Sequence, residues 1–141
     1  KIPVAIGTDG PASNNCLDMF REMFLVTGLQ KAITGDPSVM PADFVLQMAT
    51  RNGALAMGLT DCDGLAVGKR ADLTVIDLNR PNMQPLNDIE KNLVYSGSKE
   101  NVILTMIDGR ILYEKGEFFV GEEPSVVYAQ ANRIIKRIAA Q

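Results

Sequence analysis

The segment from Ile2 to Gly10 places the strongest constraint on how this chain folds. Residues 2–6 carry no polar side chain, so a strand here would be apolar on both faces, which is typical of a parallel strand buried inside a sheet. A polar loop, residues 7–15, follows directly and begins Gly7-Thr8-Asp9-Gly10. In α/β barrels the catalytic residues lie at the carboxyl ends of the strands. Asp9 is therefore the leading candidate for chemistry in this chain.

The chain contains no histidine among its 141 residues. A carboxylate is a good zinc ligand and can accept a proton from a metal-activated water. Asp9 alone, however, completes neither a metal centre nor an acid–base pair. We therefore expect the chain to be the last third of an enzyme that carries one essential carboxylate without its partners. Lys1, which is not an initiator methionine, agrees with this expectation.

Downstream of the loop, the pattern predicts two helices, a small β unit and a final helix. The first helix should be capped by Asn15 and stopped by Gly35, and its apolar surface is wide enough to need cover on more than one side. The prolines between residues 79 and 92 favour a surface loop there. Asp108-Gly109 is a strong hairpin signal, because both positions of a type I′ turn need positive φ. The expected elements are a helix over 16–33, a second helix from Pro41 interrupted at Asn52-Gly53, strands over 73–78, 102–107 and 110–114, and a helix over 125–139 with Val126, Ala129, Ile134 and Ile138 inward.

These elements indicate an α/β protein in three parts. Residues 1–60 would hold the last barrel strand, the active-site loop and the following helices, residues 61–124 an accessory β segment with its hairpin, and residues 125–141 the final helix. A net charge of −3 argues against a nucleic-acid partner. The apolar stretches are too short to span a bilayer, and Cys16 and Cys62 form no short-spaced pair, so we expect a cytoplasmic protein with reduced thiols.

Two other interpretations of the loop over residues 7–15 stay open at this point. Asp9 can simply fix a turn or cap a helix, as Asp in a glycine-containing loop often does. The order strand, glycine loop and helix N-terminus also suits anion binding, although the loop has neither the Walker spacing nor a lysine. The place of Cys16 near a helix start suits a reactive thiol, but without a histidine base a buried structural role is the better interpretation.

Several stretches of this sequence match a familiar pattern in the same order. They are Gly7-Thr8-Asp9-Gly10, Ser13-Asn14-Asn15, Leu17-Asp18-Met19-Phe20, residues 48–59, residues 64–73 with Asp77, and residues 102–116. Together they resemble the amidohydrolase superfamily, in particular the branch of S-adenosylhomocysteine/5′-methylthioadenosine deaminases and chlorohydrolase-like enzymes, and the resemblance covers nearly the whole chain.

This resemblance implies the C-terminal portion of a (β/α)₈ barrel with part of a small accessory β-sandwich and one divalent metal, usually zinc. It implies a hydrolase that removes an amino group, or a halide, from a purine-like or related small heterocycle. Asp9 matches the family's metal-ligand aspartate, which also handles the proton of the attacking water, and Ser13 and Asn14 match its substrate-facing loop. The family's histidine ligands precede this segment, so we expect the chain alone to be inactive.

Two hypotheses about the isolated chain follow. As an enzyme fragment it would expose unpaired strand edges, and we expect a homo-oligomer formed by dimerisation or domain exchange. As a non-catalytic interaction module it would be a stable monomer that binds a small molecule or an anion at residues 7–15.

Overall fold

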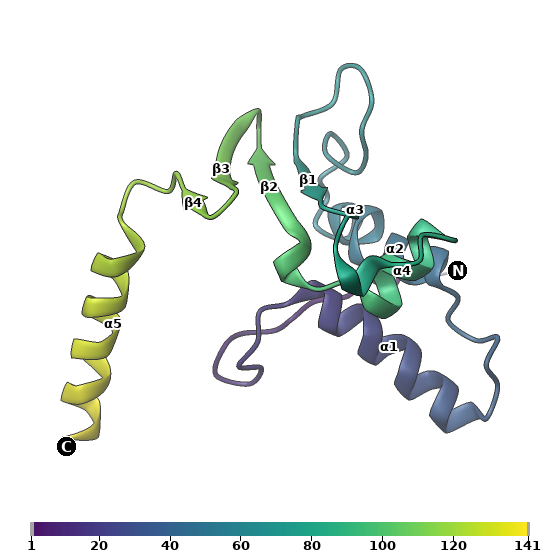
Figure 1. The fold of residues 1–141 in the computed structure, drawn as a ribbon, viewed down its shortest axis with the longest axis horizontal. Coiled ribbons are helices and arrows are strands. Elements are labelled where there is room, and N and C mark those ends of the chain that lie inside the picture. The colour runs from purple at the N-terminus through teal and green to yellow at the C-terminus, as the bar shows by residue number, and fades with distance from the viewer. Residues whose placement is uncertain (1, 141) are drawn as a thin grey trace.

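The computed structural model describes residues 2–140 and contains five helices and a small antiparallel sheet within that range (Figure 1). Two 3₁₀ turns, Pro81–Met83 and Lys99–Asn101, flank α4. The elements, in chain order, are α1 (Met19–Thr34), α2 (Ala42–Ala49), α3 (Arg51–Ala56), β1 (Leu73–Ile76), α4 (Ile89–Ser96), β2 (Val102–Ile107), β3 (Arg110–Glu114), β4 (Glu117–Phe118) and α5 (Pro124–Ala139).

The core lies among α1, α2 and α4. Met23 of α1, Val45 of α2 and Val94 of α4 are almost fully buried and pack together with Ala42. Burying aliphatic side chains of this size stabilises a fold by about 1.5–3 kcal/mol each. Packing against α2 and α4 fixes the position of α1, and therefore the position of the polar loop that leads into it.

Both ends of α1 are fixed by local interactions. The Asp18 side chain caps the N-terminus and accepts hydrogen bonds from the backbone N–H of Phe20 (3.0 Å) and Arg21 (3.4 Å). At the other end Gly35 has φ 67°, and its N–H donates to Lys31 O at 2.9 Å. The prediction of Gly35 as the helix stop is confirmed, because only glycine adopts this conformation without a Cβ penalty.

The prediction of Asn15 as the cap of this helix is wrong. The helix begins at Met19, three residues later than expected, because the Asp18 carboxylate rather than the Asn15 amide accepts the first free N–H groups. The expected cover of α1 is incomplete within residues 2–140: α1 packs against α2 and α4, but Phe24, Leu29 and Ile33 are 53%, 56% and 77% exposed.

The four strands form one antiparallel sheet in the order β1-β2-β3-β4. The hairpin between β2 and β3 turns at Asp108 and Gly109, whose φ values are 51° and 76°. This confirms the predicted Asp-Gly turn. β1 is an edge strand and ends at Ile76, two residues earlier than predicted. The structure is therefore a mixed α/β arrangement with a small antiparallel sheet.

The predicted strand over residues 2–6 is not a strand in the described part of the chain. Residues 2–5 are exposed, Ile6 is half-buried against the core, and two hydrogen bonds hold the segment to α2 and α3. Ile6 N donates to Met48 O at 3.1 Å, and the Asn52 side chain donates to Val4 O at 2.9 Å. A strand requires a neighbouring strand with which to share its ladder, and residues 2–140 place none beside this segment.

The prediction of a surface loop over residues 79–92 is also wrong. It contains a 3₁₀ turn with a fully buried Met83, followed by α4, which the Asp88 side chain caps. The break after α2 falls at Thr50, whose φ and ψ are −125° and −94°, and not at Asn52-Gly53, which lies inside α3. The first difference comes from the Asp88 cap and the burial of Met83, which the apolar periodicity did not indicate.

The final helix, α5, begins within one residue of its predicted start and ends at the predicted residue, Ala139. Figure 1 shows it beyond β4, apart from α1–α4. Val126, Ala129, Ile134 and Ile138 do not pack inward, because no residue of α5 within the described chain is buried. None of the helices within residues 2–140 has both the length and the apolar character needed to cross a membrane.

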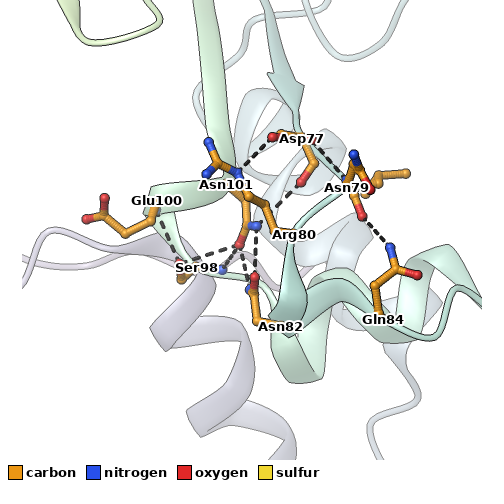
Figure 2. A network of polar contacts seen from close by, with 9 residues as sticks. Asp77, Asn79, Arg80, Asn82, Gln84, Ser98, Glu100 and Asn101 are labelled. Atoms are coloured by element: carbon orange, nitrogen blue, oxygen red, sulfur yellow. Dashed lines mark hydrogen bonds and ion pairs between the residues drawn. The ribbon is translucent and has the colours of Figure 1, made fainter.

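A polar network joins the end of β1 to the start of β2 (Figure 2). Asn101 is 1% exposed, and its Oδ1 accepts hydrogen bonds from Ser98 N (2.9 Å) and Asn82 Nδ2 (2.8 Å). Its Nδ2 donates to Asn82 Oδ1 at 3.2 Å and to Asp77 O at 3.4 Å. One buried amide thus holds together the turn after β1 and the chain entering β2.

Candidate metal-ligand loop

The loop that carries Asp9 is closed by a backbone turn. Ser13 N and Asn14 N both donate to Gly10 O, at 3.1 and 2.9 Å. Asp9 has φ 55°, a left-handed conformation that Asp tolerates better than most residues. The turn brings the fourth residue after Asp9 back beside the carboxylate.

Each oxygen of the Asp9 carboxylate accepts one hydrogen bond from this loop. Gly10 N donates to Oδ1 at 2.7 Å, and Ser13 Oγ donates to Oδ2 at 2.8 Å. The bond from Ser13, followed by the bond from Gly10, lowers the pKa of Asp9 below its ordinary value, because both stabilise the charged form. The carboxylate is exposed to solvent. Because its pKa is lowered, it is ionised at neutral pH, and the two hydrogen bonds orient it.

The predicted site residue Asn14 lies next to this carboxylate in sequence but points to the helix. Its Nδ2 donates to Glu22 Oε1 at 2.6 Å, and its Oδ1 accepts from Cys16 N at 3.2 Å. The amide therefore joins the loop to α1. The structure thus brings Ser13 onto Asp9 and directs Asn14 away from it. The substrate-binding roles expected of Ser13 and Asn14 stay predictions.

The N–H groups of this loop are largely used inside the loop. Gly10 N bonds the Asp9 carboxylate, Ser13 N and Asn14 N bond Gly10 O, and Cys16 N bonds the Asn14 side chain. An anion cradle needs N–H groups that point at the ligand. The placement of an ionised carboxylate in the same loop further disfavours anion binding there.

The Asp9 carboxylate can supply one zinc ligand but does not form a complete zinc site. A carboxylate offers about four lone-pair positions, and the two hydrogen bonds to Asp9 leave the others available. A catalytic zinc site takes three protein ligands and one open position. Residues 2–140 contain no group of three or more His, Cys, Asp or Glu side chains arranged to hold a metal.

A separate hollow of about 550 Å³ lies between the helical layer and β1, and Asp9 does not line it. Its walls are mainly apolar, with Met23, Leu46, Leu73 and Ile76 among them. Cys62 also lines it, and burial, followed by the neighbouring Asp72, raises the pKa of the Cys62 thiol. The thiol is therefore protonated near neutral pH, which disfavours a nucleophilic role.

Comparison with known proteins identifies the family. The model of the Amidohydrolase family matches residues 1–112, which is most of the chain. The chain belongs to the amidohydrolase family. Asp9 lies in the matched stretch Gly7-Thr8-Asp9-Gly10, three residues after Ile6.

Two curated amidohydrolase relatives have names that describe related reactions. The chain is 45% identical over 133 residues to a 5-methylthioadenosine/S-adenosylhomocysteine deaminase of Moorella thermoacetica, covering 94% of this chain and 31% of that protein. It is 43% identical over 126 residues to a 5′-deoxyadenosine deaminase of Methanosarcina acetivorans, covering 89% of this chain and 29% of that protein. The chain thus spans about a third of the length of these relatives.

A solved structure matches the fold closely. The crystal structure of an adenosine deaminase from Xanthomonas campestris with bound zinc superposes with a TM-score of 0.93 at 35% identity, covering 99% of this chain and 32% of that chain. The mixed α/β arrangement, with its antiparallel sheet and final helix, therefore matches part of an amidohydrolase chain.

Proposed function

We propose that this chain forms the C-terminal part of a zinc-dependent amidohydrolase that hydrolytically removes the amino group of an adenosine-type nucleoside. The observation that carries the proposal is the Asp9 carboxylate, which is ionised, oriented by two hydrogen bonds and exposed in the loop that follows residues 2–6. The relatives support the substrate class, because their names describe deaminases of adenosine derivatives. The zinc bound in the Xanthomonas campestris structure supports the metal.

In this proposal Asp9 supplies one ligand to the metal, and histidines outside this chain supply the others. Zinc contributes Lewis acidity, which makes water a usable nucleophile near neutral pH. Asp9 also accepts the proton that the attacking water loses, because its carboxylate is ionised and keeps lone pairs free. The low pKa of Asp9 suits a metal ligand, which must be deprotonated to bind.

The proposal also assigns the surroundings of the loop. Residues 2–6 would form the last strand of a (β/α)₈ barrel, and β1–β4 would belong to an accessory β-sandwich. The exposed apolar side chains of α1, such as Phe24 and Ile33, support additional polypeptide packing on the helical layer. Homo-oligomer formation by dimerisation or domain exchange through exposed strand edges stays a prediction, which light scattering in solution can test.

A chimera tests the proposal directly. This chain replaces the matched segment of the Moorella thermoacetica relative, and ammonia release from 5′-methylthioadenosine is measured. We expect a folded, active chimera, and Asp9→Asn should lower kcat by about 100-fold or more, the usual range for loss of a proton-transfer group.

The matched control is Asp36→Asn in the same chimera. Asp36 also lies in an exposed loop and accepts hydrogen bonds from the N–H and the hydroxyl of Ser38, at 2.8 and 2.6 Å, so it reproduces the local chemistry of Asp9 elsewhere. Activity should survive Asp36→Asn. A folded wild-type chimera without deaminase activity, or an Asp9→Asn chimera with full activity, would contradict the proposal.

A further inference from the structure

The position of the Ser13 hydroxyl beside Asp9 points to a second residue of the reaction centre. Ser13 Oγ lies 2.8 Å from Asp9 Oδ2 and 3.1 Å from Gly10 O. A hydroxyl carries one proton and donates to one acceptor at a time. The shorter contact, to a charged oxygen, is the stronger one. The proton of Ser13 is therefore directed at the Asp9 carboxylate.

The two hydrogen bonds to Asp9 restrict how its carboxylate can turn. Gly10 N holds Oδ1 and Ser13 Oγ holds Oδ2, so rotation about the Cα–Cβ bond or about the Cβ–Cγ bond breaks both. The Gly10 bond comes from the adjacent backbone and tolerates any side chain at position 13. The bond to Oδ2 depends on the Ser13 hydroxyl alone. Removing it frees one end of the carboxylate.

We propose that Ser13 is a positioning residue that orients the Asp9 carboxylate for metal binding and proton acceptance, a role that rests on the proposed function. Each carboxylate oxygen keeps a lone pair for those two tasks, because the loop uses only one on each. A hydroxyl whose proton is committed to Asp9 has only acceptor capacity left for a substrate. This role therefore differs from the substrate-facing role that the family resemblance implied for Ser13.

The variants Ser13→Ala, Ser13→Thr and Thr8→Val, made in the chimera, separate these roles. Ser13→Thr keeps the hydroxyl. Thr8→Val removes a hydroxyl from the same loop that donates to the backbone oxygen of Asp9 at 3.1 Å and not to its carboxylate. Thr8→Val thus controls for general loosening of the loop.

The expected result is a fall in kcat of about 10-fold to 100-fold for Ser13→Ala with little change in KM, the usual range for loss of a hydrogen bond to a metal ligand. Zinc should pass from this variant to a chelator correspondingly faster, which is a readout independent of turnover. Ser13→Thr should keep kcat and the rate of zinc loss close to their wild-type values, and Thr8→Val should do the same. A raised KM with unchanged kcat and zinc retention would overturn the proposal in favour of substrate binding. Equal losses in Thr8→Val would overturn it in favour of a loop effect.

A measurement on this chain alone keeps the two proposals distinguishable. Three-bond NMR couplings to the Asp9 β-protons report whether this side chain occupies one rotamer about its Cα–Cβ bond or several. We expect one rotamer in the wild type and in Ser13→Thr, and averaging in Ser13→Ala. Unchanged couplings in Ser13→Ala overturn the positioning role even if the chimera is active. An inactive chimera with the expected couplings contradicts the deaminase proposal and leaves the orientation of Asp9 by Ser13 established.

Discussion

The Asn101 network should account for a large part of the stability of the junction between β1 and β2. Asn101→Ala removes three hydrogen bonds of 2.8–3.2 Å, one from Ser98 N and two exchanged with the Asn82 amide. At about 1 kcal/mol net for each bond the loss is about 3 kcal/mol. Asn82 is exposed and can bond to water instead, which reduces the expected loss to about 2 kcal/mol.

Urea unfolding followed by circular dichroism measures this loss. With a slope of about 2 kcal/mol per molar, the midpoint should fall by about 1 M urea. The matched control is Asn79→Ala, which removes an exposed amide from the same turn and should change the free energy of unfolding by less than about 0.5 kcal/mol. If Asn101→Ala shifts the midpoint no further than Asn79→Ala does, the network is not a source of stability and the reasoning fails.

Two further predictions concern α4 and its surroundings. In Gly97→Ala, the new Cβ lies 2.4 Å from a backbone carbonyl oxygen of α4 and 2.7 Å from the Phe20 ring, and unfolding in urea should show a loss of about 1–3 kcal/mol. Gly53→Ala, which meets open space within α3, should instead gain up to about 1 kcal/mol, and equal effects would contradict the packing argument. The side chain of Lys91, followed by its N–H, lowers the pKa of Asp88 below 3.8, so this contribution to stability is complete above that pH and is lost as the pH falls through the lowered value. Carbon-13 NMR titration should show the Asp88 midpoint rising in Lys91→Met, and an unmoved midpoint would refute the assignment.

Local signals predicted the elements whose conformation is decided locally. Asp108-Gly109 fixed the hairpin because its two residues supply the positive φ values that the turn needs, and Gly35 ended α1 for the same reason. The neighbouring prolines favour a loop where the structure has α4, so the sequence pattern did not predict this helix. What secures α4 is the Asp88 cap and the packing of Val94 against Val45, a contact between residues far apart in the chain.

The sequence predicts Asp9 as a site residue but does not predict the hydrogen bonds that surround it. A carboxylate after an apolar segment is visible in the sequence, whereas the hydrogen bond from Ser13 depends on the turn closed at Gly10 O. The i to i+4 spacing of Asp9 and Ser13 was the available signal. The residue type of Asn15 favours a helix cap, yet the Asp18 side chain lies beside the free N–H groups of α1 and caps it. Residue type indicated the chemistry, and backbone geometry decided the partners.

The zinc content of the chimera and of this chain alone tests the central claim most directly. After dialysis, elemental analysis should find about one zinc ion per wild-type chimera, much less in Asp9→Ala, and none in stoichiometric amount on this chain by itself, because a zinc site needs ligands beyond one carboxylate. Tight stoichiometric zinc on the isolated chain, or full zinc retention by the Asp9→Ala chimera, would contradict the account.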